Sequence, residues 1–298
     1  MVRLISDLKN RFLAENIVGR FIYINVAVYV LFALLDVFAT LFSITSPALY
    51  LKMWLELPSA PAHYIQQPWS LVTYMFLHGG LMHILWNMLA LYWFGKIYLS
   101  FFSTRHFVGL YLLGGVAGGL FFMLAYNIFP MFTSTGEYAY LVGASAAVLA
   151  IVTASAVRVP DYKINLLIIG EVKLSTLAVA TVIISLLLLT SDNAGGSFAH
   201  LGGAFAGWAF AYYLNKGRDL TSYINKILDF LVTICRDGLK NVHKPKMKIF
   251  KGKRSEDYEY NAQKKEHNDE IDKILEKLKK KRILLALRAR EKKTFRRI

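Results

Sequence analysis

Residues 140–157 read YLVGASAAVLAIVTASAV. The stretch has no charged side chain, and its 18 residues approach the length of about 20 that an α-helix needs to cross a bilayer. Small residues at a spacing of four allow the backbones of two membrane helices to approach closely. Such residues recur here at Gly143, Ala146, Ala147, Ala150 and Ala154. The stretch therefore predicts a membrane helix that packs closely against a neighbour.

Five more apolar stretches of spanning length surround this one, at residues 21–45, 71–95, 106–128, 173–190 and 197–214. The first begins too far from the N-terminus and is too long for a cleavable signal, so we expect a retained helix. With a hydrophobic content of 55%, the chain is more apolar than a soluble domain of this size needs to be. The sequence therefore predicts an all-α, polytopic membrane protein with six transmembrane helices in residues 21–215, an N-terminal segment at 1–20 and a tail at 216–298.

The tail holds most of the positive charge. The whole chain has a formal net charge of +15, and the tail has 25 lysines and arginines against 12 aspartates and glutamates. A charge run without a motif or interleaved aromatic side chains is weak evidence for nucleic-acid binding, so we expect no nucleic-acid partner. Residues 262–293 predict a charged helix that is solvated and leans on the anionic inner leaflet of the lipid bilayer. Its partial apolar stripe consists of Ile271, Ile274, Leu275, Leu278, Ile283, Leu284 and Leu287.

Lysines and arginines in the short loops predict the orientation, because they are retained on the cytoplasmic side. One set of segments consists of the N-terminus, the loops at 96–105 and 158–173, and the tail. Before the tail is counted, it holds Arg3, Lys9, Arg11, Arg20, Lys96, Arg105, Arg158, Lys163 and Lys173. The loops at 46–70, 129–139 and 191–196 hold only Lys52. We therefore expect a multi-pass protein of the cell (inner) membrane with both termini in the cytoplasm.

Few polar side chains lie within the predicted spans, and each is a functional hypothesis because burying it in lipid is costly. The second span contains HGGLMHILWN, residues 78–87, in which His83 and Asn87 lie four apart on one helix face. The fourth span opens near Ser145 and the sixth near His200. All three spans run from outside to inside in the predicted topology, with these side chains one or two turns below the outer end. We therefore expect the four to share one site.

Close packing of the fourth and sixth spans would place His200 beside Ser145. The sixth span also carries small residues, at Ala199, Gly203, Ala206 and Gly207. A serine beside a neutral imidazole is the minimum activated nucleophile. A lone membrane serine is more often a packing residue, and a lone histidine is as often an interhelical hydrogen-bond partner. The common depth of the four side chains favours a shared catalytic site.

A carboxylate to orient the histidine is not evident. Asp36, Glu137 and Asp192 are the only candidates in or near the spans, so a Ser-His dyad is favoured over a triad. Asp36 is interpreted as either a buried hydrogen-bonded residue or an interhelical anchor. The Ser145 backbone N–H, the Asn87 amide and the His83 imidazole are suitable donors for a developing oxyanion.

A metal site is the rival chemistry. His78 and His83 are five residues apart, which is about 140° around a helix, whereas the zinc pattern needs histidines four apart. The lone Cys235 has no partner for a disulfide or a thiolate site. We therefore expect no metal, and we interpret His78 as a structural residue at the start of the second span.

These motifs resemble those of the rhomboid intramembrane serine proteases, over roughly residues 20–215. The resemblance rests on His78-x4-His83-x3-Asn87, on Gly143-x-Ser145, and on His200 followed by Gly203 and Gly207. It implies a six-helix bundle with a water-accessible cavity open to the outside, cleavage of membrane-anchored substrates, and no metal or cofactor. By position it implies Ser145 as nucleophile, His200 as base, and His83, Asn87 and the Ser145 amide as oxyanion hole. His78, Gly143, Gly203 and Gly207 are then structural residues near the site.

The chain departs from the family pattern at two places. Ala146 stands where the family has glycine, adding a methyl group beside the nucleophile that could narrow the site or alter specificity. The Trp-Arg pair of many relatives is absent from the first external loop, which instead has Trp54 and the Pro-rich run 57–61. Residues 253–261 of the tail are similar to extensions on rhomboids of Bacteroidota, which indicates no function.

The sequence leaves other functions open. Single-span or polytopic membrane proteins are the expected substrates, with small or helix-breaking residues near the cut because a hydrogen-bonded helix hides its carbonyls. A catalytically silent relative that binds membrane clients is the alternative, although this chain retains both Ser145 and His200. A small transporter would call for repeated halves with broken helices, which the sequence does not display. The oligomeric state is left open.

Overall fold

The computed structural model describes residues 10–132, 139–166, 170–191, 193–242, 263–270, 273, 276 and 277. The chain divides into two compact units, Met1–Ile234 and Cys235–Ile298. In the second unit, residues 263–270 are helical. The apolar stripe predicted for 262–293 and the segment 253–261 lie outside the described residues.

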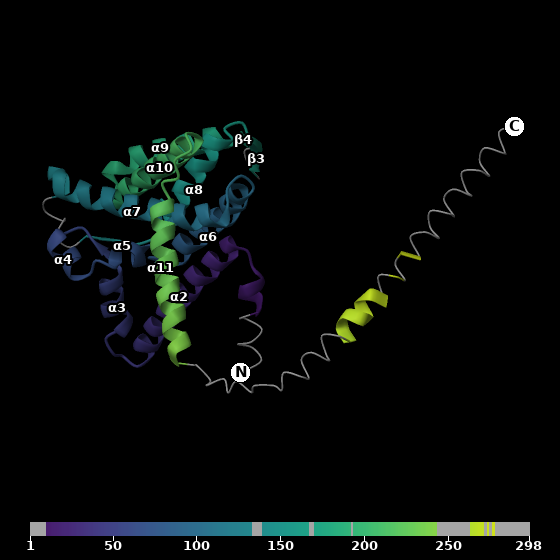
Figure 1. Ribbon diagram of the computed structural model, residues 1–298. Coiled ribbons are helices and arrows are strands. Elements are labelled where there is room, and N and C mark those ends of the chain that lie inside the picture. Colours follow the sequence, from purple (N-terminus) through teal and green to yellow (C-terminus); the bar gives the residue numbers. More distant parts are fainter. Residues whose placement is uncertain are drawn as a thin grey trace. The chain divides into compact units, whose positions relative to one another are not determined.

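The first unit is mainly a bundle of helices (Figure 1), so the prediction of an all-α fold is confirmed. Two short antiparallel strand pairs, β1 with β2 and β3 with β4, are the only strands in the described part of the chain. The elements are α2 (Ile17–Leu41), α3 (Pro47–Leu55), β1 (Leu57–Pro58), α4 (Pro61–Gln66), α5 (Ser70–Thr73), η1 (Tyr74–Phe76), α6 (Leu81–Leu99), α7 (Thr104–Ile128), η2 (Pro130–Phe132), β2 (Tyr140–Leu141), α8 (Ser145–Arg158), β3 (Lys163–Leu166), β4 (Gly170–Lys173), α9 (Leu174–Leu187), η4 (Leu188–Thr190), α10 (Ala194–Asn215) and α11 (Ser222–Val242).

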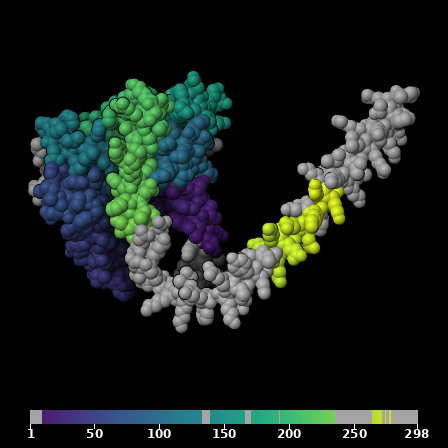
Figure 2. All heavy atoms as spheres, viewed as in Figure 1, coloured from purple at the N-terminus to yellow at the C-terminus, as the bar shows by residue number. Residues whose placement is uncertain are grey.

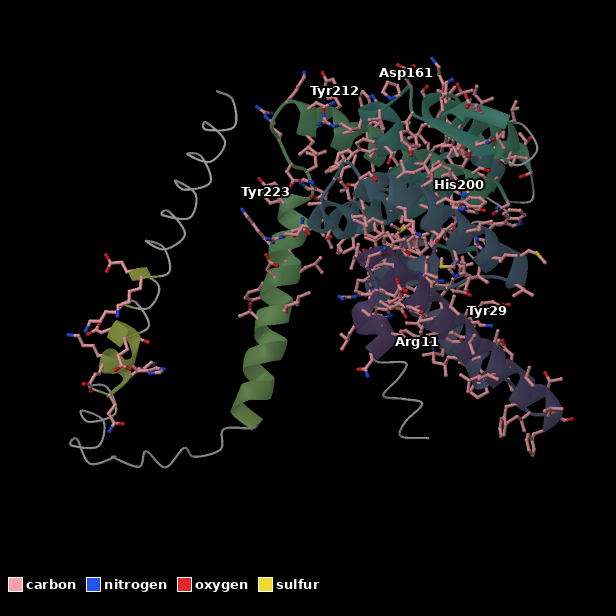
Figure 3. The ribbon with its side chains drawn as sticks, turned by 90° about the vertical axis from the view of Figure 1, so that its right-hand side faces the viewer. Arg11, Tyr29, Asp161, His200, Tyr212 and Tyr223 are labelled. Carbon is pink, nitrogen blue, oxygen red and sulfur yellow. The ribbon has the colours of Figure 1, made fainter. Side chains whose placement is uncertain are left out.

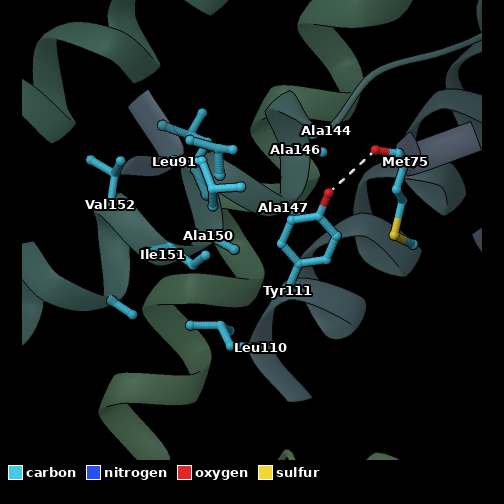
Figure 4. Close-up of a cluster of buried hydrophobic side chains, with 14 of the residues drawn as sticks. Met75, Leu91, Leu110, Tyr111, Ala144, Ala146, Ala147, Ala150, Ile151 and Val152 are labelled. Carbon is cyan, nitrogen blue, oxygen red and sulfur yellow. Dashed lines mark hydrogen bonds between the residues drawn. The ribbon is translucent and has the colours of Figure 1, made fainter. Parts of the chain in front are cut away.

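Helix α8 is the centre of the bundle. It packs against α6, α7, α9 and α10, and ten of its 14 residues are buried. A helix that is apolar all round is expected to be enclosed by other helices. Figure 4 shows its alanines in the core beside Leu110 and Tyr111 of α7, where the Tyr111 hydroxyl donates to the Met75 carbonyl oxygen at 3.3 Å. The fold therefore holds the N-terminus of α8 from several sides.

Helices α8 and α10 meet at backbone distance. A Cβ atom added at Gly203 would lie 2.1 Å from the Ala146 carbonyl oxygen, and one at Gly207 would lie 2.2 Å from the Ala150 carbonyl oxygen. Any side chain at either glycine would force the helices apart. The close packing predicted from the small residues of these two stretches is therefore present.

Two of the described helices are long and apolar enough to cross a membrane by length and composition, α2 and α7. Ser145–Arg158 and Leu174–Thr190 are shorter apolar helices. The count of six spans therefore stays a prediction. The predicted start of the second span was wrong, because residues 71–80 form α5, η1 and a glycine-containing loop before α6 begins at Leu81.

The segment between α2 and α6 is tied to the bundle by polar contacts. The Asp36 carboxylate accepts from the Lys52 ammonium at 2.7 Å and from the Ser46 hydroxyl at 2.6 Å, so Asp36 anchors α3 to α2. Strand β1 pairs with β2 in the register Leu57 to Leu141. This pairing fixes the chain four residues before α8 begins.

Helix α11 was not predicted, because the tail was interpreted from its charge. Apolar residues of α11 recur at helical spacing, and Tyr223, Ile227 and Phe230 are each more than half exposed. Figure 2 shows residues 222–234 of α11, in green, at the surface of the first unit to which they belong. The Arg105–Asp229 ion pair joins α11 to the start of α7.

Replacing Gly203 by alanine is expected to destabilise the protein by about 1–3 kcal/mol, the usual cost of forcing extra atoms into a packed core. The added methyl group would meet the Ala146 carbonyl, which is backbone and cannot rotate away. Thermal unfolding in detergent measures the effect. Gly80→Ala is the matched control, because a Cβ there meets nothing within 4 Å. Equal midpoints for Gly203→Ala and wild type would contradict the close contact.

Candidate active site

Ser145 is the first residue of α8, and the chain before it is held by its backbone. Gly143 has a φ of +123°, which strains any residue with a side chain, and its N–H donates to the Tyr74 carbonyl oxygen at 2.9 Å. The N-cap residue, Ala144, makes no side-chain cap. The first N–H groups of α8 therefore lack intrahelical acceptors and lie beside the Ser145 hydroxyl. Helix α8 begins at Ser145 and not at residue 140, so Ser145 does not lie inside the helix, while its depth below the outer end of the span stays a prediction.

The His200 ring faces Ser145 from α10. Its Nε2 atom lies 2.8 Å from the Ser145 Oγ atom, within hydrogen-bond range. Both side chains are partly exposed, and Figure 3 labels His200 among the helices of the first unit, apart from Asp161 and Tyr212. The contact requires the close approach of α8 and α10 at Gly203.

His83 packs against Gly143 in the loop that leads to Ser145. Its Nδ1 atom accepts from the Gly79 N–H at 3.3 Å, so in the neutral ring the proton is on Nε2. That atom would lie 2.8 Å from a Cβ atom at Gly143. His83 therefore presents an Nε2–H donor to the backbone just before Ser145.

Asn87 is one turn further along α6 and is buried. Its amide nitrogen donates to the His83 carbonyl oxygen at 2.9 Å, which uses one of the two amide hydrogens. The side chain lines the same cavity as Ser145, His83 and His200. The structure thus brings the four predicted residues around one space.

His78 lies in the loop before α6 and not within the helix. Its ring packs edge-on against the His83 ring, with centroids 5.2 Å apart. Among the described residues, no group of three His, Cys, Asp or Glu side chains has the geometry to hold a metal ion. Glu137 and Asp192 lie outside the described residues, and Asp36 is engaged with Lys52.

A cavity of about 880 Å³ opens from these residues and runs between α6 and α9. Its walls are mainly apolar or aromatic, with Trp86, Trp93 and Phe94 from α6, Val148 and Val152 from α8, and Leu177 from α9. None of the described residues that line it is an aspartate, glutamate, lysine or arginine. The space suits an apolar peptide segment, with polar groups gathered at Ser145.

Ser185 of α9 was not among the predicted site residues. Its Oγ atom lies 3.4 Å from the His200 Nδ1 atom, on the side of the ring away from Ser145. The side chain is 2% exposed. The sequence gives little indication that Ser185 belongs to the site, because a single serine in an aliphatic span is usually a packing residue.

The methyl group of Ala146 points away from the cavity. Ala146 is 1% exposed, and a Cβ atom added at Gly118 of α7 would lie 2.5 Å from the Ala146 Cβ. The residue does not line the cavity. The extra methyl group therefore fills space against α7, and the idea that it narrows the site finds no support in the geometry.

The arrangement is chemically suited to acyl transfer. A hydroxyl lies beside an imidazole nitrogen, and a helix N-terminus, a histidine N–H and an amide lie around the same hydroxyl. A nucleophile with its base and a set of oxyanion donors are the parts that a hydrolase of this kind needs.

A family model described as Rhomboid domain matches residues 65–217, which include all four residues. Presenilin-associated rhomboid-like protein A, mitochondrial, of Danio rerio is 25% identical over 158 residues, covering 50% of this chain and 38% of that protein. RHOMBOID-like protein 12, mitochondrial, of Arabidopsis thaliana is 28% identical, covering 50% and 47%. Rhomboid-like protease 3 of Toxoplasma gondii is 28% identical, covering 53% and 56%. The chain thus spans from under two fifths to just over half the length of these relatives.

Ala146→Gly is expected to lower stability by roughly 1–2 kcal/mol, because it removes a buried methyl group and places glycine inside a helix. The reactivity of Ser145 should stay within about twofold, since no more than roughly 0.4 kcal/mol of the loss is expected to reach the hydroxyl. Fluorophosphonate labelling rates and thermal unfolding measure the two effects. A large gain in labelling rate would mean that the methyl group does restrict the site.

Proposed function

The chain belongs to the rhomboid family, and from this premise we propose that it is an intramembrane serine endopeptidase that hydrolyses peptide bonds in or near transmembrane segments of membrane proteins. The observation that carries the proposal is the distance of 2.8 Å between His200 Nε2 and Ser145 Oγ at the head of an apolar cavity. Ser145 is the nucleophile and His200 its base. The bundle at residues 21–215 is the catalytic domain.

In the first half of the reaction, His200 Nε2 takes the proton of Ser145 as Oγ attacks the scissile carbonyl carbon. The carbonyl oxygen becomes an oxyanion, which accepts from the first N–H groups of α8, the second Asn87 amide hydrogen and His83 Nε2–H. The helix dipole of α8 adds a favourable field at that point. His200 then gives its proton to the departing amine nitrogen as the peptide bond breaks, leaving an acyl-enzyme.

In the second half, water attacks the acyl-enzyme carbonyl carbon while His200 takes a proton from the water. The tetrahedral intermediate uses the same oxyanion donors. It collapses when His200 returns the proton to Ser145 Oγ, which releases the new carboxyl end and restores the starting dyad. No metal or cofactor takes part in the proposed cycle.

The length of α8 supports a site inside the bilayer. Its 14 residues measure about 21 Å, against roughly 30 Å for the hydrocarbon core. If its C-terminus at Arg158 reaches the inner interface, Ser145 lies below the outer one. Unpaired backbone N–H groups at that depth are tolerated only where they line a polar or water-filled space, which the cavity provides.

The apolar cavity supports a substrate segment taken from the membrane. Trp86 and Trp93 of α6 line it, and so do Leu177 and Thr181 of α9. A peptide must leave its helix to expose a carbonyl to Ser145, so segments with small or helix-breaking residues are the proposed substrates. The alternative function is that of a catalytically silent protein that binds membrane clients, and it would be favoured if the protein cuts no peptide.

The orientation is also part of the proposal, with six spans and both termini in the cytoplasm. The ion pair of Arg105 with Asp229 ties the first half of α11 to the end of α7 that follows the predicted cytoplasmic loop. The exposed apolar side chains of α11, including Tyr223 and Phe230, suit a helix lying in the inner interface.

Purified protein in liposomes is expected to cut a single-span substrate, and Ser145→Ala and His200→Ala should each lower the rate by at least about a thousandfold. The two losses should not add, because the residues act as one unit. Gel analysis and mass spectrometry of the products measure cutting. If the folded wild-type protein leaves several substrates intact, the alternative of a catalytically silent, client-binding protein is favoured.

The topology is expected to appear in cysteine labelling. In a Cys235→Ala background, a membrane-impermeant maleimide should label Gln66→Cys on intact spheroplasts of a bacterial host. Ser100→Cys should react only after the membrane is permeabilised. Both positions are exposed, and the cysteine-free parent is the control. Labelling of Ser100→Cys on intact spheroplasts would invert the proposed orientation.

A further inference from the structure

The ring of His200 has two nitrogens, and both have neighbours. Nε2 lies 2.8 Å from Ser145 Oγ and Nδ1 lies 3.4 Å from Ser185 Oγ. To act as a base through Nε2, the neutral ring must carry its proton on Nδ1. The group facing Nδ1 therefore decides whether His200 is in the reactive tautomer.

The hydroxyl of Ser185 can only accept a hydrogen bond from His200. Its single hydrogen is donated to the Thr181 carbonyl oxygen, one turn earlier in α9, at 2.9 Å. The oxygen that remains offers lone pairs and no proton. The contact is consistent only with donation from Nδ1–H of His200 to Ser185 Oγ.

No aspartate, glutamate, lysine or arginine is among the described residues that line the cavity, so no charged side chain there can orient His200. The titratable side chains that line it besides His200 are His83 of α6, Tyr126 of α7 and Tyr140 of β2. His83 is committed to Gly79 through Nδ1. A neutral hydroxyl thus occupies the position that a carboxylate holds in a Ser-His-Asp triad.

We propose that Ser185 is the positioning residue that holds His200 in the Nδ1–H tautomer. The site then works as a hydrogen-bonded row of Ser145, His200 and Ser185 without a carboxylate, in which Ser185 orients the ring and takes up no proton. The inference rests on the proposed protease function and extends it. The distance of 3.4 Å is long for a neutral contact, and it shortens when His200 becomes an imidazolium, because hydrogen bonds from charged donors are shorter and stronger. Ser185 therefore acts most strongly in the transition state.

A purely structural role for Ser185 makes a different prediction, and the chain contains the matched control. Ser155 of α8 is also buried and donates back to the carbonyl oxygen four residues earlier, Ile151, at 2.8 Å. Among the described residues, the Ser155 hydroxyl makes no hydrogen bond to a histidine. Ser155→Ala therefore removes the same kind of intrahelical bond without touching His200.

The experiment compares full-length wild type, Ser185→Ala, Ser185→Thr and Ser155→Ala in liposomes with a single-span substrate. Ser185→Ala should lower kcat by roughly ten- to a hundredfold with KM within about twofold, the loss expected for a hydrogen bond to a charged group. The acidic limb of its kcat/KM profile should move to lower pH, because the imidazolium has lost an acceptor. Ser185→Thr keeps the hydroxyl and should recover most of the rate.

Unchanged kcat and pH profile in Ser185→Ala would overturn the inference, as would an equal loss of kcat in Ser155→Ala. Thermal unfolding of the two alanine variants should show similar destabilisation, which separates folding from positioning.

A second measurement keeps the inference testable without turnover. Protein labelled with ¹⁵N-histidine reports the tautomer of His200, whose signals are identified by their loss in His200→Gln. Wild type should show a protonated Nδ1 and an unprotonated Nε2, and Ser185→Ala should show a mixture. That result with no cleavage would sink the proposed function alone, whereas a mixture already in wild type would sink the role of Ser185.

Discussion

The contact of the α10 glycines with the α8 carbonyls is the constraint on which the rest of the structure depends. Gly203 and Gly207 lie so close to the carbonyl oxygens of Ala146 and Ala150 that no side chain fits between them. In a membrane, where water does not drive helices together, such close packing is a principal source of helix association. The register that it imposes also sets the distance between Ser145 and His200, because Gly203 lies one turn after His200 and Ala146 directly follows Ser145. Packing and chemistry are therefore fixed by the same contact.

Much of this could be predicted from the sequence where a pattern has a physical period. The small residues of 140–157 and 197–214 predicted the helix contact, and the polar side chains at similar predicted depth pointed to one site. The failures have equally physical causes. Hydropathy does not distinguish the loop at 77–80 from the helix after it, so α6 began later than predicted. The apolar face of α11 was obscured by the charge of the tail. Ser185 of α9 contacts His200 of α10, and the spacing of residues along the sequence does not predict which side chains of two different helices meet.

The N-terminus of α8 combines a turn that glycine adopts without strain with uncapped N–H groups, and both are held by elements outside the helix. Gly143 has a positive φ, and its N–H is bonded to the Tyr74 carbonyl oxygen. Tyr74 is itself fixed by donation of its hydroxyl to the Gly115 carbonyl oxygen at 2.6 Å. A capping side chain at Ala144 would satisfy the helix and compete with an oxyanion for the same donors. The neighbours of α8 thus stabilise a helix start that the local sequence leaves unsatisfied.

In the proposed mechanism the two histidines around Ser145 act in opposite tautomers, and each tautomer is set by a neutral neighbour. The Gly79 N–H donates to His83 Nδ1, which leaves Nε2–H as a donor towards the oxyanion. In the relation we propose, Ser185 Oγ accepts from His200 Nδ1, which leaves Nε2 to act as the base towards Ser145. A carboxylate would orient His200 more strongly, but an ionised group in a cavity of low dielectric constant carries a large desolvation cost. The Ser185 hydroxyl donates its own proton to Thr181, so it can only accept from His200 and would orient the ring in the same way without a charge. If the proposed activity holds, the direction of a hydrogen bond takes over in this site the part that a charged carboxylate plays in hydrolases that work in water.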